Sequence, residues 1–157
     1  IKEKFSQRDI EVKAVILVRE PLSRIKSAVR FNLDRKNYSE GIDLNETDFE
    51  KALLQYFKTD HCILRTQYEN IIREASAVFP AENIYIGFYE SMFEESEVRR
   101  ISDFLQIEAN FEFAKVRVNK TRNSVHETAS DSMIKEFYVD TYNYFYQNFP
   151  DTKLLWA

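Results

Sequence analysis

The stretch ILVREPLSRIKSAVRF, residues 16–31, decides the fold because a strand pattern changes into a helix pattern within it. Residues 12–18 are nearly all apolar and rich in β-branched side chains, which is typical of a strand buried on both faces in a parallel sheet. Pro21 stands where the first turn of a helix accepts proline, and apolar residues at helical spacing predict a helix over 22–34. With a second apolar strand at 83–89, the pattern predicts an α/β fold whose parallel sheet is flanked by helices.

Further helices are predicted wherever apolar residues recur every three to four positions. Their ranges are 49–57, 68–79, 96–105 and 131–148. Thr47 or Asp48 is expected to cap the first of them, and Ser96 the third. Pro80 is expected to end the second, since the residue before a proline disfavours helix. The aromatic residues of the last helix, Phe137, Tyr138, Tyr142 and Phe145, are expected in the core rather than around a ligand.

Length and composition restrict the class of protein. The 157 residues predict one domain, 1–157. A net charge of -4 argues against binding of nucleic acid by bulk electrostatics, and no apolar run approaches the ~20 residues of a membrane span. The lone Cys62 excludes an internal disulfide and predicts the cytoplasm, with the Golgi lumen as the alternative for a eukaryotic protein. Because the chain begins at Ile1 without a methionine, we expect a piece of a longer protein that lacks its N-terminal part.

Three polar residues of the opening stretch form a candidate anion site. Arg19 ends the predicted strand, and ligands of open α/β sheets bind beyond the carboxyl ends of strands. Ser27 follows eight residues later, with Arg24 one turn before it. A guanidinium grips a phosphate with two parallel hydrogen bonds, a hydroxyl adds another, and the helix start offers backbone N–H groups. The pattern favours a phosphate monoester, and the alternative is a surface pairing of the arginines with Glu20 or Asp34.

The same stretch resembles the 3′-phosphate-binding segment of the sulfotransferases that use 3′-phosphoadenosine 5′-phosphosulfate (PAPS). In that family a strand ends in Arg-(Asp/Asn/Glu)-Pro, with a second arginine five residues and a serine eight residues after the first arginine. The matching residues here are Arg19, Glu20, Pro21, Arg24 and Ser27. Residues 67–105 are similar to the family's next block, and VRVNKTRNS, residues 116–124, resembles its late basic loop. The resemblance covers residues 12–150.

The resemblance implies a P-loop-like three-layer fold, incomplete at the N-terminus, and roles for particular residues. Arg19 and Ser27 would hold the 3′-phosphate. Lys120 and Arg122 would close the late loop over the same phosphate. Arg24 would brace the helix or assist in binding.

Other parts of the family pattern are weaker or missing. Tyr68 would lie near the nucleotide. The Gly-rich loop that cradles the 5′-phosphosulfate is absent, since the only glycines are Gly41 and Gly87. Neither His61 nor His126 matches a motif for the catalytic base, so no catalytic residue is assigned. If the chain is truncated, we expect it to be inactive alone.

The reaction that the resemblance implies moves a sulfuryl group from PAPS to a hydroxyl or amine, which leaves 3′-phosphoadenosine 5′-phosphate (PAP). A small-molecule or carbohydrate acceptor is expected, and a carbohydrate is favoured because the Arg-Glu-Pro-x-x-Arg and Asn-Lys-x-Arg forms resemble carbohydrate-type and bacterial members. No metal is implied, and the oligomeric state is not predicted. One alternative is a non-catalytic nucleotide-binding or interaction module that has lost the donor loop. Another is a P-loop kinase relative, whose Gly-x-x-x-x-Gly-Lys loop is missing from this sequence.

Overall fold

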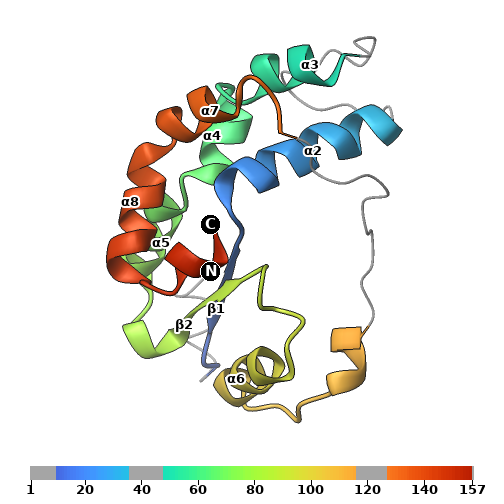
Figure 1. The fold of residues 1–157 in the computed structure, drawn as a ribbon. Helices are drawn as coiled ribbons and strands as arrows, with labels where there is room; N and C mark the ends of the chain where they lie inside the picture. Colours follow the sequence, from blue (N-terminus) through green and yellow to red (C-terminus); the bar gives the residue numbers. More distant parts are fainter. Residues whose placement is uncertain (1–9, 36–47, 116–126, 157) are drawn as a thin grey trace. The chain divides into compact units, whose positions relative to one another are not determined.

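The computed structural model describes residues 10–35, 48–115 and 127–156 (Figure 1). These residues form two compact units, and each unit combines stretches that are far apart in the sequence. Unit 1 holds the described residues 10–18 and 70–115, and unit 2 holds the remainder. The chain passes from one unit to the other directly after the first strand.

Unit 1 contains the parallel sheet that the sequence predicts. Strand β1 (Ala14–Val18) pairs in parallel with strand β2 (Ile84–Phe88) along the whole length of both. Helix α6 (Glu95–Leu105) packs against β2. The Tyr85 hydroxyl of β2 donates a 2.5 Å hydrogen bond to Glu97 in the first turn of that helix. The described residues therefore form a mixed helix and strand structure around a small, two-stranded parallel sheet.

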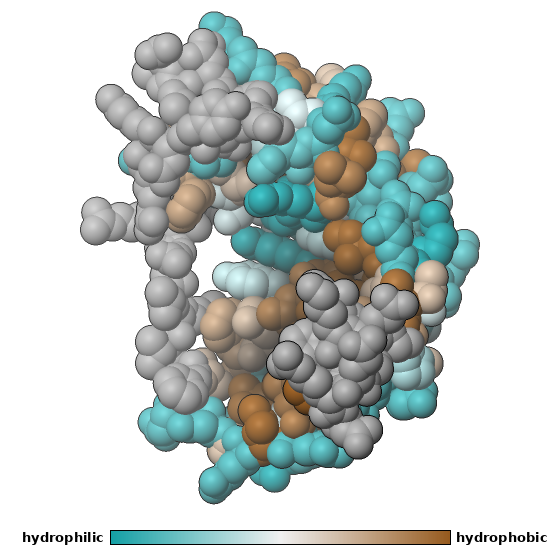
Figure 2. All heavy atoms as spheres, turned by 180° about the vertical axis from the view of Figure 1, so that it is seen from behind, coloured by the Kyte–Doolittle hydropathy of each residue, from teal (hydrophilic) through white to brown (hydrophobic). Residues whose placement is uncertain are grey.

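The expectation that the first strand is buried on both faces is wrong. Val15 and Leu17 are 38% and 50% exposed, although their partners across the ladder, Tyr85 and Gly87, are buried. The reason is the size of the described sheet: α6 covers one face at β2, and β1 has only one neighbouring strand among the described residues. Apolar side chains are visible among the polar ones on the surface shown in Figure 2.

Helices make up most of the remaining described chain. They are α2 (Pro21–Arg35), α3 (Phe49–Tyr56), α4 (Asp60–Thr66), α5 (Tyr68–Val78), α7 (Asp131–Phe137), α8 (Val139–Asn148) and α9 (Thr152–Leu155). Two short 3₁₀ turns, η1 (Ala81–Asn83) and η2 (Phe111–Lys115), lie in unit 1. Helix α5 begins in unit 2 and continues in unit 1. In the part of the chain that the structure describes, no helix combines the length and the apolar character needed to cross a membrane.

The helix caps follow the sequence in one case and depart from it in another. Asp48 caps α3, because its side chain accepts hydrogen bonds from the N–H groups of Glu50 and Lys51. The cap predicted at Ser96 is wrong. Helix α6 starts one residue earlier, with Glu94 at the N-cap position and no side-chain capping bond, so Ser96 lies within the first turn.

The helix predicted over 131–148 is divided in two. Tyr138 has non-helical backbone angles and separates α7 from α8. Its buried hydroxyl donates a 2.6 Å hydrogen bond to the carbonyl of Phe57. Tyr142 and Phe145 are buried as predicted, and Phe145 packs against Trp156 with ring centroids 5.0 Å apart. The aromatic residues thus form much of the core of unit 2, although Phe137 is partly exposed.

Candidate functional site

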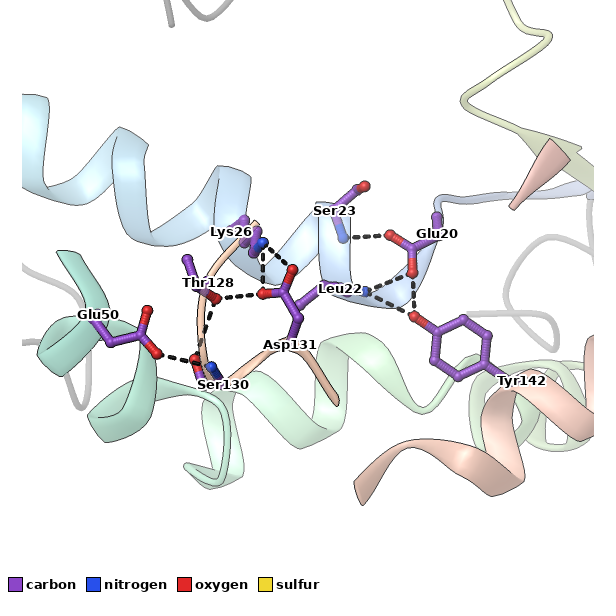
Figure 3. Close-up of polar contacts among 9 residues, drawn as sticks. All are labelled: Glu20, Leu22, Ser23, Lys26, Glu50, Thr128, Ser130, Asp131 and Tyr142. Carbon is purple, nitrogen blue, oxygen red and sulfur yellow. Dashed lines mark hydrogen bonds and ion pairs between the residues drawn. The ribbon is translucent and has the colours of Figure 1, made fainter. Parts of the chain in front are cut away.

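The start of α2 is capped by the residue before its proline (Figure 3). The Glu20 carboxylate accepts hydrogen bonds from the N–H groups of Leu22 at 3.2 Å and Ser23 at 2.5 Å. It also accepts a hydrogen bond from the hydroxyl of Tyr142, which comes from α8. Burial and the adjacent Glu20 carboxylate raise the pKa of Tyr142 far above its ordinary value, so the hydroxyl stays protonated and donates.

This cap corrects one expectation about the anion site. Pro21 has no N–H, and the N–H of Arg24 donates to the Glu20 carbonyl at 2.9 Å. With Leu22 and Ser23 bonded to the Glu20 carboxylate, every N–H group in the first turn already has an acceptor or does not exist. The prediction that these backbone groups bind a phosphate is therefore wrong. Any anion at this end of α2 must be held by side chains.

Arg19 and Ser27 occupy the positions that the sequence predicts. Arg19 directly follows β1, and Ser27 lies in the second turn of α2. Both residues are half-buried, and both belong to unit 2. The Ser27 hydroxyl makes no hydrogen bond within the described residues, so it can donate to an added anion.

Arg24 contacts the neighbouring helix α4. Its Nη1 atom donates to the Thr66 hydroxyl at 3.0 Å and lies 3.9 Å from the Cys62 sulfur. Thr66 and Cys62 are completely buried. Burial raises the pKa of the adjacent Tyr56 hydroxyl, and the positive charge of Arg24 opposes that rise. The observed contacts of Arg24 therefore join α2 to α4.

The remaining candidate residues lie in contacts with aromatic rings or outside the described residues. Tyr68 is buried at the start of α5, with its ring edge-on to Phe145 at 6.0 Å between centroids. Lys120 and Arg122 lie outside the described residues. His61 lies in α4 beside the ring of Tyr56. The structure thus places Arg24 and Ser27 on α2 and Arg19 two residues before that helix, and it shows Tyr68 in a core contact.

A buried ion pair beside Ser27 is a feature that the sequence reasoning missed. The ammonium group of Lys26 is 2.6 Å from both carboxylate oxygens of Asp131, the first residue of α7 (Figure 3). Only 1% of the Lys26 side chain is exposed. Its position three residues before the buried Val29, within the apolar stripe of α2, is the signal that could have identified it.

The Asp131 carboxylate accepts hydrogen bonds from more than one residue. Partial burial alone would raise the pKa of Asp131, but hydrogen bonds from Lys26 and Thr128 outweigh it and lower the pKa below its ordinary value. The preceding residue is also fixed, since the Ser130 N–H donates to Glu50 of α3 at 2.8 Å. The chain entering α7 is thus tied to both α2 and α3.

The described ranges contain no group of three or more His, Cys, Asp and Glu residues that could hold a metal ion.

Comparison with known proteins gives one match. A family model described as a sulfotransferase domain matches residues 4–153, which is most of the chain. Neither the curated proteins nor the solved structures contain a match. The matched region includes the whole candidate site, from Arg19 to the basic segment with Lys120 and Arg122.

Proposed function

The chain belongs to the sulfotransferase domain family, and from this premise we propose that it serves sulfuryl transfer from PAPS to a hydroxyl or amine acceptor. The observation that carries the proposal is the Arg19-Glu20-Pro21 segment, where the chain leaves β1 and begins α2, with Ser27 in the second turn of that helix. The family match covers residues 4–153, and this segment lies within the matched residues.

In the proposed site, Arg19 and Ser27 bind the 3′-phosphate of the donor, and Lys120 and Arg122 add positive charge to it. A guanidinium and a hydroxyl are suitable donors, because charge-assisted hydrogen bonds to phosphate are about twice as strong as neutral ones. The first-turn N–H groups of α2 are already bonded, so the side chains supply the affinity. Arg24 assists by holding α2 against α4, and the proposed contact of Tyr68 with the nucleotide stays a prediction.

The bound donor supplies an activated sulfuryl group, and its product is PAP. This chain's own contribution is to bind and orient the donor through the 3′-phosphate, so that an acceptor meets the sulfuryl group in a fixed geometry. No catalytic base is assigned among its residues. We propose a carbohydrate as the acceptor, on the form of the Arg-Glu-Pro-x-x-Arg and Asn-Lys-x-Arg motifs.

Calorimetric titration with PAP tests the proposal. We expect wild type to bind, and Arg19→Ala to lose on the order of 1.5–3 kcal/mol of binding free energy, the range for hydrogen bonds to charged groups. Arg73→Ala is the matched control, because Arg73 is an exposed arginine of α5. Equal affinities of wild type and Arg19→Ala would remove Arg19 from the site. Transfer from radiolabelled PAPS then separates an enzyme from a module that binds the nucleotide without turnover.

A further inference from the structure

Arg19 and Ser27, which are proposed to bind the 3′-phosphate, each adjoin a buried charged residue in the sequence. Arg19 is followed by Glu20, of which 8% is exposed, and Ser27 is preceded by Lys26, of which 1% is exposed. Both buried charges are bonded to other parts of unit 2 (Figure 3). Their role must therefore be sought in what they hold in place.

Both buried charges are bonded to the C-terminal helices. The Tyr142 hydroxyl of α8 donates to the Glu20 carboxylate and accepts a 3.3 Å hydrogen bond from the N–H of Leu22. Asp131 of α7 binds the Lys26 ammonium through both of its oxygens. Separations of 122 and 105 residues in sequence show that these are tertiary contacts and not local ones.

Two such contacts fix the orientation of a helix. A buried charge without its partner is strongly unfavourable, so each bond tolerates little movement. Glu20 and Lys26 are six residues apart, about 9 Å along a helix at 1.5 Å per residue. Fixing both ends of this stretch prevents α2 from sliding or turning about its axis. The backbone positions of Arg19, which directly precedes Glu20, and of Ser27, which directly follows Lys26, are then fixed as well.

We propose that Tyr142 and Asp131 are positioning residues for the 3′-phosphate site, and that they act through Glu20 and Lys26. This inference rests on the proposed function. The C-terminal helices would thus contribute to nucleotide affinity without touching the nucleotide, by holding the guanidinium and hydroxyl at the geometry that one phosphate requires.

The first experiment is a titration of Tyr142→Phe with PAP. This variant removes only a hydroxyl, and we expect roughly five-fold weaker binding, the equivalent of one lost hydrogen bond. Tyr85→Phe is the matched control. Its hydroxyl also donates to a buried glutamate near the start of a helix, Glu97 of α6, but it lies in unit 1. Urea unfolding should show a similar loss of stability for the two variants, whereas only Tyr142→Phe should lose affinity.

A second experiment separates positioning from general destabilisation. In an Arg19→Lys background, the side chain keeps its charge but loses the forked guanidinium, so its binding should depend less on how the backbone beside Glu20 is held. The additional loss caused by Tyr142→Phe should then be smaller than in wild type, and independent, additive losses would overturn the proposal. Lys26→Met, which releases the other contact, should also weaken PAP binding.

The outcomes distinguish this inference from the proposed function. If wild type does not bind PAP, the proposed function fails and the positioning role fails with it. If wild type binds and Tyr142→Phe binds equally well, only the positioning role is overturned. Equal losses in Tyr142→Phe and Tyr85→Phe would also overturn it, because the effect would then follow stability rather than the site.

Discussion

Breaking the ion pair between Lys26 and Asp131 should cost very different amounts depending on which partner is changed. The two side chains differ in exposure, at 1% for Lys26 and 20% for Asp131. Asp131→Asn removes the carboxylate that binds an ammonium group of which only 1% is exposed. Lys26→Met leaves a carboxylate that water reaches and that still accepts a hydrogen bond from Thr128. We therefore expect Asp131→Asn to be the more destabilising change.

The magnitudes follow from this difference. Removing one partner of a buried pair costs about 3–5 kcal/mol when the remaining charge is fully enclosed, so this range applies to Asp131→Asn. Losing the partner of a partly hydrated acceptor costs about 1–2 kcal/mol, so this range applies to Lys26→Met, whose methionine also suits the apolar surroundings. Because a domain has only about 5–15 kcal/mol of stability, the first variant loses a large fraction of it.

Urea unfolding followed by tryptophan fluorescence measures both variants. The chain has one tryptophan, Trp156, which is buried in unit 2 with the ion pair, so its emission reports the relevant unit. The double variant should be more stable than Asp131→Asn alone, since it no longer encloses a positive charge that has lost the Asp131 carboxylate. The reasoning is refuted if Lys26→Met is as costly as Asp131→Asn, or if the double variant recovers nothing.

Two further predictions concern pH and the end of a helix. Because the pKa of Asp131 is lowered in the folded state, its contribution to stability is complete above the ordinary value of 3.8 and is lost as the pH falls through the lowered value. In a urea series between pH 5 and 2, wild type should therefore lose stability more steeply than Lys26→Met, and parallel curves would contradict the assignment. Gln106 ends α6 with a φ of 58°, in the left-handed region, so Gln106→Gly should stabilise the fold by roughly 0.5–1 kcal/mol. An unchanged or lower midpoint of thermal unfolding would show that its side chain compensates for the strain.

The elements predicted from sequence were those with a strong local pattern. Residues 12–18 and 83–89 became β1 and β2 with the parallel pairing expected of them, and the helix after Pro21 begins and ends within one residue of the prediction. Apolar spacing and proline are local signals, so they do not depend on the rest of the chain. Helix α4 was missed because its seven residues span only two turns, too few for a periodic pattern.

The candidate site was likewise predictable only where its signal is local in the sequence. The spacing of Arg19 and Ser27 makes them candidates, and the acidic residue before the proline was a sign that a side-chain carboxylate lies near the helix N-terminus. The partners of Glu20 and Lys26 could not be predicted, because they lie more than a hundred residues away in sequence. A sequence pattern shows that a charge falls on an apolar stripe, but tertiary packing decides which group neutralises it.

The way in which the two units divide the chain has a consequence for its synthesis. A nascent chain emerges N-terminus first, and the described residues of unit 1 are all translated by position 115. Glu20 and Lys26 must wait until Tyr142 and Asp131 leave the ribosome before they gain these partners. Until then Leu22, Ile25 and Val29 have no complete core to enter, so an incomplete translation product that stops before α7 should depend on chaperones and be cleared by proteases.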